Sequence, residues 1–469
     1  MIFTFEEIVR ATGGEISGKG DGSVAGVSTD SRTVSPRDLF IALKGERFDG
    51  HDFIPAVAGK GVRAFVVEKS WLSTHEVPCG SFLTGVSDTL RALGDLATFH
   101  RDRFSLPVVG ITGSNGKTTT KEMLADILAA VGRGLKTSGN LNNLIGLPRM
   151  LLQLDGGHNW AVLEMGMSEL GEIDRLAEIA KPDIGVITNA LPAHLETLGS
   201  VETVARAKGE LFLRLSEGGC AVFNADDPLI SGCPSPEGVK RLSFGIRSGD
   251  IRAEKIENLG KEGQTFTLCL PSGAVPVYLK AFGLHNIYNA LAAAAAAFAL
   301  DVNSGSILAG LESFTPYDKR FSVEECDGIT LIDDSYNANP GSMKAALETL
   351  RGLKGDRRGI AVLGDMLELG ESSVSAHEEI GMLAASCVEK IYVIGEMAEP
   401  VAKGALNAGL PPASVIIASD HEELLAQLLA DLDNGDHVLV KGSRGMKMET
   451  VAEGIRNLPD NRGKKGALA

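Results

Sequence analysis

The sequence predicts an α/β protein of three domains, with mostly parallel sheets in its central and C-terminal parts. From residue 106 the chain reads as a buried strand, a glycine-rich loop and a helix, "LPVVGITGSNGKTTTKEMLADILAAVG". From residue 328 onward, strand-like runs alternate with amphipathic stretches of helix length, a pattern typical of a parallel sheet covered on both faces. A length of 469 residues also allows about two to four domains.

Changes in the pattern along the chain predict the domain boundaries, which we expect at 1–105, 106–318 and 319–469. The first domain mixes short strand-like runs, such as 63–67, with many turn residues. In the second domain, apolar runs predict strands at the segments "WAVLEM" and "DIGVITN", and "NIYNALAAAAAAFALD" is strongly helical by intrinsic propensity. The third domain has five predicted strands, at 329–335, 358–365, 390–396, 414–419 and 436–443.

Composition excludes several classes of partner. The formal net charge of −16 argues against a general affinity for nucleic acid or for an anionic membrane. The six cysteines show no C-x-x-C pair, so we expect reduced, mostly structural thiols. The first residues carry acids where a signal peptide needs bases, and no apolar run approaches about 18 residues. We therefore expect a cytoplasmic monomer that neither binds nucleic acid nor inserts into a membrane.

The stretch "GITGSNGKTTT", residues 110–120, is the first candidate site. The common phosphate-loop pattern G-x-x-x-x-G-K-[ST] needs a glycine where this chain has Ile111, so the segment is either a plain strand-to-helix turn or a tighter phosphate loop. Its position favours the phosphate loop, because backbone N–H groups and the positive end of a helix would converge on one point. Lys117 could then reach the outer phosphates, and the Thr118 hydroxyl could bind Mg²⁺.

Glu164 closes the apolar run "WAVLEM" and is the second candidate. It is either a solvated loop acid or an oxygen ligand for Mg²⁺. Ligand sites in open α/β sheets gather at the carboxyl ends of strands, and Mg²⁺ prefers oxygen ligands, so the position favours a ligand.

Several further motifs occur in a fixed order. They are "LEMGMSELGEI", "TNALPAHLETLGS", "ARAKGELF", "GLHNIYNALAA" and "DDSYNANPGSMKAAL", all after the glycine loop. Together they resemble the Mur ligases, ATP-dependent amide-forming enzymes of peptidoglycan synthesis. The shortened loop of that family, T-G-x-N-G-K-T, matches residues 112–118, and the resemblance extends from about residue 25 to 445.

Within the family, "STDSR" (28–32) and "DLFIALKGERFDGHDFI" (38–54) resemble the nucleotide-sugar domain of the last two ligases of the pathway. "DDSYNANPGS" and "VLGDMLELG" resemble the last ligase, which joins D-alanyl-D-alanine to UDP-MurNAc-tripeptide, and the D-N-P-R motif of the preceding ligase is absent. The resemblance implies an N-terminal UDP-substrate domain, a central P-loop ATPase domain and a C-terminal Rossmann-like domain that binds the dipeptide and closes over ATP. Three alternatives stay open: a ligase adding a diamino acid to UDP-MurNAc-dipeptide, one adding glutamate to folate, and a binding protein that only hydrolyses ATP.

The resemblance also implies the site residues. The reaction makes an acyl phosphate, so cations and metal ions must hold three anionic groups together. The expected ATP-binding residues are Gly113, Ser114, Asn115, Gly116, Lys117, Thr118, Thr119, Asn286, Asn289, Arg320 and Asp334. The expected Mg²⁺ ligands are Thr118, Glu164, His194 and Lys208 as a carbamate, and the catalytic residues are Lys117, His194 and Lys208. The expected substrate-binding residues are Ser28, Thr29, Asp30, Ser31, Arg32, Lys44 and Gly45 for the UDP substrate, and Tyr336, Asn337 and Asn339, with the loop 441–449, for the dipeptide.

Several of these residues also have ordinary structural interpretations. His194 could be a capped loop histidine, Lys208 a lysine on a solvated helix face, and STDSR a plain loop. Carbamylation requires an amine that spends time neutral, so the functional interpretation of Lys208 predicts a desolvated or cation-crowded side chain. We expect Asn286 and Asn289, one helical turn apart, to contact the adenine, since amides can pair with both donor and acceptor edges. His285 either assists them at the start of the same helix or is an ordinary N-terminal helix residue. Arg320 and Asp334 lie at or beyond the domain junction, so their contact with ATP would require domain closure.

Overall fold

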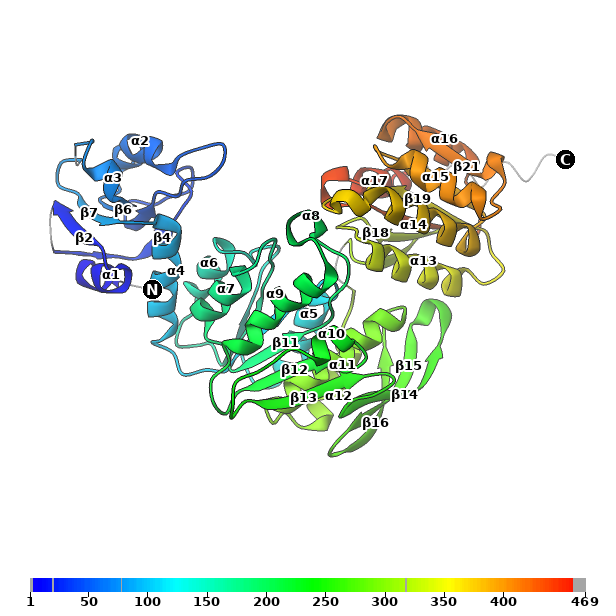
Figure 1. Cartoon of the computed structure of the whole chain (residues 1–469), viewed down its shortest axis with the longest axis horizontal. Helices are drawn as coiled ribbons and strands as arrows, with labels where there is room; N and C mark the ends of the chain where they lie inside the picture. The colour runs from blue at the N-terminus through cyan, green and yellow to red at the C-terminus, as the bar shows by residue number, and fades with distance from the viewer. Residues whose placement is uncertain (1–2, 19–20, 77, 317–318, 459–469) are drawn as a thin grey trace.

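The computed structural model describes residues 3–18, 21–76, 78–316 and 319–458. Three α/β units follow one another along the chain, and each of them has its own main sheet (Figure 1). The N-terminal and C-terminal units lie at opposite ends of the long axis, with the central unit between them (Figure 1). The predicted fold class is confirmed.

The N-terminal unit has a five-stranded sheet in the order β2-β7-β6-β5-β4. Four of these strands run parallel, and β2 pairs antiparallel with β7. The predicted strand at 63–67 is β6. The elements are β1 (Phe3–Thr4), α1 (Phe5–Thr12), β2 (Glu15–Gly18), β3 (Ser23–Val24), β4 (Gly26–Ser28), β5 (Asp38–Ile41), α2 (Ile54–Gly59), β6 (Ala64–Glu68), α3 (Lys69–Leu72), β7 (Phe82–Val86) and α4 (Thr89–Arg101).

The central unit has a nine-stranded sheet in the order β16-β15-β14-β13-β12-β11-β8-β10-β9. Its strands are β8 (Val108–Thr112), β9 (Gly134–Lys136), β10 (Trp160–Glu164), β11 (Ile184–Ile187), β12 (Cys220–Asn224), β13 (Lys240–Gly245), β14 (Ile251–Asn258), β15 (Gln264–Leu270) and β16 (Gly273–Leu279). Its helices are α5 (Lys117–Leu128), α6 (Gly146–Leu151), α7 (Glu172–Ala180), α8 (Leu195–Leu198), α9 (Val201–Leu213), α10 (Pro228–Ser231), α11 (Leu284–Ala299) and α12 (Ser304–Ser313). Because β8 runs parallel to both of its neighbours, β10 and β11, the loops that follow these three strands meet at one edge of the sheet.

The C-terminal unit has a six-stranded sheet in the order β17-β18-β22-β19-β20-β21. All five strands predicted there are confirmed, and they run parallel. The antiparallel edge strand β17 was not predicted, because "SVEEC" is too polar to read as a buried strand. The elements are β17 (Ser322–Cys326), β18 (Ile329–Asp334), α13 (Pro340–Lys354), β19 (Gly359–Gly364), α14 (Ser373–Cys387), β20 (Lys390–Ile394), α15 (Ala398–Asn407), β21 (Val415–Ala418), α16 (His421–Asp431), β22 (His437–Lys441) and α17 (Glu449–Arg456).

Two general expectations can be compared with this structure. All six cysteines are free thiols, as expected. Within the described part of the chain, no helix combines the length and the apolar character needed to cross a bilayer.

The alanine-rich helix α11 is the centre of the core behind the glycine loop. Its residues 292–297 are all alanines with 0% exposure, and α11 packs against α5 and strands of the sheet. Short side chains let helices approach closely, and Gly310 lets α12 approach α5 more closely than an alanine would. A Cβ atom on Gly310 would lie 2.4 Å from the Cα atom of Ile127 in α5. The position of α5, and with it the loop that α5 continues, therefore depends on small residues in α11 and α12.

The close approach of α12 to α5 predicts that Gly310→Ala is destabilising. Alanine normally favours a helix over glycine by about 1 kcal/mol, but here the added methyl group meets backbone atoms, and overpacking costs about 1–3 kcal/mol. Thermal denaturation of the purified variant should give a lower melting temperature than that of the original chain. Gly59→Ala is the matched control, because a Cβ atom there meets nothing within 4 Å. A Gly310→Ala protein as stable as the control would contradict this packing.

Candidate active site

The glycine loop joins the buried strand β8 to the start of α5 at Lys117, as predicted. Two of its glycines are required by their surroundings. Gly113 has φ 151° and Gly116 has φ 84°, both in the region that favours glycine. A Cβ atom would lie 1.8 Å from Thr188 Oγ1 at Gly113, and 2.1 Å from Asn289 Oδ1 at Gly116. The loop is therefore packed tightly against two neighbouring elements and held in one shape.

Lys117 lies over this loop. Its Nζ donates hydrogen bonds to the Gly113 carbonyl at 2.7 Å and to the Ser114 carbonyl at 3.4 Å. Burial lowers the pKa of the ammonium group, Glu164 opposes this change, and Arg320 lowers the pKa further. A desolvated cation beside helix N-terminal amides is suited to bind phosphate oxygens.

Glu164 ends β10 and is 2% exposed, which excludes the solvated-acid interpretation. Its Oε2 accepts a hydrogen bond from Thr118 Oγ1 at 2.8 Å, and its Oε1 accepts one from Asn142 Nδ2 at 2.9 Å. Adjacent oxygen ligands around a six-coordinate Mg²⁺ with bonds of about 2.0–2.1 Å lie roughly 2.9 Å apart, so the Thr118 and Glu164 oxygens fit such an ion.

No group of three or more His, Cys, Asp or Glu residues suited to a metal occurs within the described ranges. Mg²⁺ commonly takes only one or two protein carboxylates and completes its shell with water and phosphate oxygens. The pair formed by Thr118 and Glu164 matches that kind of partial site.

Sequence reasoning missed the loop that supports Glu164. Residues 137–143, "TSGNLNN", follow β9 at the same edge of the sheet. The Thr137 hydroxyl accepts a hydrogen bond from the Glu164 backbone N–H at 2.8 Å, while Asn142 holds its carboxylate. A polar, asparagine-rich run directly after a short strand was the signal available for this loop.

Lys208 is 2% exposed on α9, so its side chain does not lie on a solvated face. Burial, with the nearby Lys117 ammonium, lowers the pKa of Lys208 well below its usual value. Among the interactions of the described residues, none is a hydrogen bond or ion pair of its Nζ atom. These are the conditions that carbamylation requires.

His194 precedes α8 and has φ 54°, which is rare for a residue other than glycine. Its side chain makes no capping hydrogen bond. Instead, Nδ1 lies 2.6 Å from Oε2 of Glu368, a residue of the C-terminal unit. The hydrogen bond from His194 lowers the pKa of the Glu368 carboxyl, and burial opposes this effect. Glu368 is a second residue that sequence reasoning did not single out, although "VLGDMLELG" contains it.

The two asparagines predicted at the adenine lie buried on α11 behind the loop. Asn289 Nδ2 donates to Asn286 Oδ1 at 3.0 Å, and Asn286 Nδ2 donates to the Phe282 carbonyl at 2.8 Å. Both amides are thus partly used within the protein, and Asn289 also packs on Gly116. Burial, assisted by Lys441, lowers the pKa of the neighbouring His285 to about 4. Contact with adenine stays a prediction.

Arg320 and Asp334 belong to one charged cluster at the edge of the C-terminal unit. Asp334 Oδ2 lies 2.6 Å from Lys441 Nζ, and its Oδ1 accepts a hydrogen bond from the Phe321 backbone at 3.1 Å. Burial raises the pKa of the Asp334 carboxyl, although Lys441 and Arg320 oppose this change. The Arg320 guanidinium also lowers the pKa of Lys117 in the glycine loop.

The residues predicted to bind the dipeptide fall into two groups. Tyr336 lies under Arg320, whose guanidinium carbon is 4.0 Å from the ring centroid. Asn337 contacts the loop 441–449, since its carbonyl accepts from Lys441 Nζ at 2.8 Å and its Oδ1 accepts from the Arg444 backbone at 3.2 Å. Asn339 is separate, because its side chain turns to the glycine loop and bonds Asn115. The structure therefore groups Tyr336 and Asn337 but not the Asn339 side chain.

The STDSR loop of the N-terminal unit forms its own network. The Arg32 guanidinium binds both Asp30 oxygens, at 2.9 and 2.7 Å, and lowers the pKa of that carboxyl. Ser28 Oγ bonds the Asp30 backbone, and Lys60 Nζ donates to the Ser31 carbonyl at 2.8 Å. These contacts suit an ordinary structured loop as well as a binding loop, so the predicted roles of residues 28–32 stay predictions.

Lys44 and Gly45 lie in a second loop of the same unit. Lys44 pairs with Asp49 in an isolated β-bridge, and the Gly45 N–H donates to the Phe48 carbonyl at 2.9 Å.

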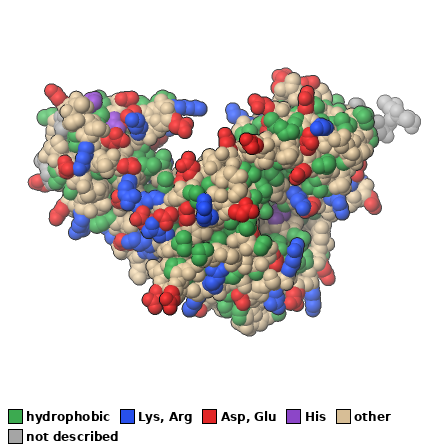
Figure 2. All heavy atoms as spheres, in the orientation of Figure 1, with side chains coloured by type: hydrophobic (Ala, Val, Ile, Leu, Met, Phe, Trp, Pro, Cys, Tyr) green, Lys and Arg blue, Asp and Glu red, His purple; other side chains and the backbone are tan. Residues whose placement is uncertain are grey.

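On the face shown in Figure 2, the surface is hollowed between the N-terminal and C-terminal units, above the central unit. Positive and negative side chains are interspersed over this face (Figure 2), with no large basic patch on it.

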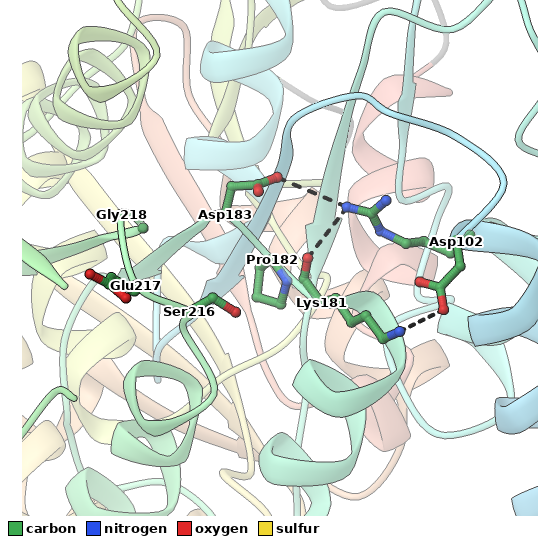
Figure 3. Close-up of a pocket in the computed structure, with 9 residues that line it drawn as sticks. Asp102, Lys181, Pro182, Asp183, Ser216, Glu217 and Gly218 are labelled. Carbon is green, nitrogen blue, oxygen red and sulfur yellow. Dashed lines mark hydrogen bonds and ion pairs between the residues drawn. The ribbon is translucent and has the colours of Figure 1, made fainter. Parts of the chain in front are cut away.

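A separate surface cavity of about 460 Å³ lies at the other end of the central strands (Figure 3). Asp183, which precedes β11, lines it together with Lys181 and Asp102. The Lys181 and Asp102 side chains pair at 2.6 Å, and Arg101 lies 4.0 Å from Asp183, so four of the five charged residues that line this cavity are paired with one another. The cavity is remote from the glycine loop, because the loop follows the opposite ends of the strands.

Comparison with known proteins identifies the family of the chain. Three domain families match consecutive parts of the chain: "Mur ligase family, catalytic domain" at 23–99, "Mur ligase middle domain" at 111–297, and "Mur ligase, glutamate ligase domain" at 319–444. The chain therefore belongs to the Mur ligase family.

Individual members of the family are similar to the chain over nearly its whole length. The chain is 37% identical over 464 residues to a protein of Escherichia coli (strain K12) named UDP-N-acetylmuramoyl-tripeptide–D-alanyl-D-alanine ligase, covering 98% of each. A crystal structure of MurF from Acinetobacter baumannii is 34% identical, with a TM-score of 0.89 over 97% of this chain and 99% of that one. MurF ligase from Thermotoga maritima in complex with ADP is 31% identical, with a TM-score of 0.81 over 92% and 96%.

The pairing of Thr118 with Glu164 predicts the effect of Glu164→Gln. The substitution keeps the shape of the side chain and removes the charge that would attract Mg²⁺. The Mg²⁺ concentration needed for half-maximal ATP turnover should rise by at least roughly tenfold, since even substitutions behind a metal ligand commonly cost about 10–100-fold in affinity. Glu169→Gln, an exposed acid on the same loop, is the control and should leave the Mg²⁺ requirement unchanged. Equal requirements in both variants would exclude Glu164 as a ligand.

Proposed function

We propose that this chain is an ATP-dependent ligase that joins D-alanyl-D-alanine to UDP-MurNAc-tripeptide and so forms the UDP-MurNAc-pentapeptide precursor of peptidoglycan. The observation that carries the proposal is the joint arrangement of the glycine loop, the Thr118–Glu164 oxygen pair and the buried amine of Lys208. The names of its relatives support the substrates, and the ADP complex of the Thermotoga maritima relative supports ATP as the nucleotide. We assign residues 1–105 to the UDP substrate, 106–318 to ATP, and 319–469 to the dipeptide and closure.

The chemistry has two steps. A carboxylate oxygen of the tripeptide attacks the γ-phosphorus of ATP, and the bond to ADP breaks, which leaves an acyl phosphate. The dipeptide amine then attacks the acyl carbon, loses a proton, and expels inorganic phosphate. Both steps gather negative charge at one point, so cations fixed in advance lower their barriers.

The chain's residues divide this work. Lys117 and the backbone amides of residues 113–119 bind the outer phosphates. Thr118 and Glu164 would hold a Mg²⁺ ion, which would supply positive charge to the phosphate oxygens, and His194 would bind at a second metal position. Arg320 and Asp334 reach the nucleotide from the C-terminal unit, and the closed arrangement keeps water from the acyl phosphate.

Lys208 supports the second metal position once it is modified. Its neutral amine nitrogen attacks the carbon of CO₂, a C–N bond forms, and one proton is released, which leaves a carbamate anion. The lowered pKa of Lys208 supports this step, because only the neutral amine has the lone pair that attacks. The new anion then lies close to Lys117, which stabilises it.

The other interpretations differ in their amine substrate or in having no ligation step. A diamino-acid ligase is disfavoured because the D-N-P-R motif is absent from the sequence. A protein that only hydrolyses ATP has no need for a desolvated lysine beside a phosphate loop. A monomeric state and a cytoplasmic location remain predictions.

Product identification tests the proposal directly. The purified chain, ATP, Mg²⁺, UDP-MurNAc-tripeptide and D-alanyl-D-alanine should yield UDP-MurNAc-pentapeptide, ADP and phosphate, with the pentapeptide identified by mass spectrometry. Parallel reactions replace the dipeptide by a diamino acid or by glutamate, with the matching acceptor. Ligation of either of these amines in place of the dipeptide, or ATP hydrolysis that needs no acceptor, would refute the assignment.

The role of Lys208 predicts loss and rescue of activity. Lys208→Ala should lose most ligase activity, and acetate or formate should restore part of it by replacing the carbamate. Arg206→Ala, an exposed cation on the same helix, is the control and should be unaffected by either anion. Full activity of Lys208→Ala without added anion would show that no carbamate is used.

A further inference from the structure

We propose that Glu368 is a positioning residue for His194: its carboxylate fixes the ring and the tautomer in which Nε2 can bind a metal ion. The C-terminal unit would thus complete a metal position on the central unit. This inference rests on the proposed function, in which His194 binds Mg²⁺.

The contact joins two segments that are distant in sequence. His194 follows β11 of the central unit, and Glu368 follows β19 of the C-terminal unit. Nδ1 of His194 and Oε2 of Glu368 lie 2.6 Å apart, with side-chain exposures of 30% and 59%. A second contact supports the same alignment, because the Glu196 backbone N–H donates to the Glu368 carbonyl at 3.3 Å. The pair therefore lies between two loops that also meet through their backbones.

The hydrogen bond selects one form of the imidazole. An ionised carboxylate can only accept, so Nδ1 must carry the proton in this contact. In the neutral ring, Nε2 then has the free lone pair, and only a nitrogen with a free lone pair can bind a metal ion. Metal-binding histidines commonly donate their other N–H to a carboxylate or carbonyl, which fixes the ring and raises its basicity.

Both residues of this contact have an unfavourable backbone conformation. His194 has φ 54° and Glu368 has φ 63°, both in the left-handed region where residues with a Cβ atom are uncommon. Such conformations are energetically unfavourable for residues with a Cβ atom and tend to cluster at functional sites. An exposed ion pair contributes little to stability, because water screens it. The pair alone does not offset the cost of two strained residues, which favours a role beyond stability.

An independent contact holds the two units in the same alignment. Asn339 Nδ2 donates to Asn115 Oδ1 at 2.7 Å, and Asn115 Nδ2 donates to Asn339 Oδ1 at 3.1 Å. The orientation of the Asn339 amide is fixed because its Oδ1 also accepts from the Ser342 backbone at 2.9 Å, at the start of α13. The C-terminal unit thus contacts both the glycine loop and the His194 loop.

Metal titration tests whether Glu368 orients His194 for metal binding or only holds the C-terminal unit against the central unit. Mn²⁺ binding to the full chain, with a non-hydrolysable ATP analogue and UDP-MurNAc-tripeptide, is followed by electron paramagnetic resonance. The original chain should bind two Mn²⁺ ions. Glu368→Gln and Glu368→Ala should keep the ion at Thr118 and Glu164 and bind the other roughly 10–100-fold more weakly. Glu371→Gln, an exposed acid in the same segment, removes the same charge and should bind both ions normally.

The tautomer gives a readout that needs no metal. Nitrogen-15 NMR of labelled histidines at about pH 8.5, where a histidine ring is normally neutral, should show His194 protonated at Nδ1. A His194→Gln spectrum assigns the signal. In Glu368→Ala the signal should shift toward the Nε2–H form or a mixture of the two forms. Asn339→Ser is the control, because it removes the Asn115 contact between the two units but keeps a side chain that can cap a helix. It should change the His194 signal less than Glu368→Ala does.

The outcomes are distinguishable from failure of the proposed function. If the original chain makes the pentapeptide but the Glu368 variants keep both Mn²⁺ affinities and the Nδ1–H signal, the positioning role is wrong and the ligase assignment stands. If the original chain binds a single Mn²⁺, His194 is not a metal ligand and the positioning role is also wrong. If the original chain makes no pentapeptide, the proposed function itself fails.

Discussion

The hydrogen bond between Thr118 and Glu164 is the contact on which the rest of the site depends. It joins the first turn of the helix after the glycine loop to the end of the neighbouring strand, and both side chains are buried. A buried carboxylate needs partners to offset its lost hydration, and Asn142 donates a second hydrogen bond to it. The Thr137 hydroxyl accepts a hydrogen bond from the Glu164 backbone N–H and so fixes the end of the strand. Three segments of the chain, the start of α5, the end of β10 and the loop 137–143, therefore have to be in place before the two oxygens lie at a spacing that suits a small cation.

The amines of Lys117 and Lys208 are a second feature of the site that depends on burial. Lys208 is buried, Lys117 is partly buried, and burial together with the Lys117 ammonium lowers the pKa of Lys208. Placing two amines together in this way is unfavourable unless anions or modification compensate for it. The triphosphate, the metal-bound carboxylates and a carbamate would all reduce this repulsion, so the charge pattern of the protein alone is complementary to the proposed reactants.

The sequence predicted the parts of the fold that local pattern controls. The glycine loop, the parallel strands of the C-terminal unit and the alanine-rich helix were confirmed because apolar runs, glycine positions and helix propensity act over a few neighbouring residues. Glu164 was found because it ends an apolar strand. Asn142, Glu368 and the Asn115–Asn339 pair were missed, since their importance arises from contacts between segments 22 to 224 residues apart. The interior position of Lys208 was likewise not evident from spacing, and only the family resemblance singled it out.

The contacts that hold the C-terminal unit on the central one include an exposed ion pair and a pair of amides. Each polar contact of this kind contributes about 1 kcal/mol or less in water, because solvent competes for the same groups. Contacts of this strength can break and re-form without disturbing the core of either unit. The same chain can then enclose its reactants during the chemical steps and still release a bulky nucleotide-linked product without unfolding.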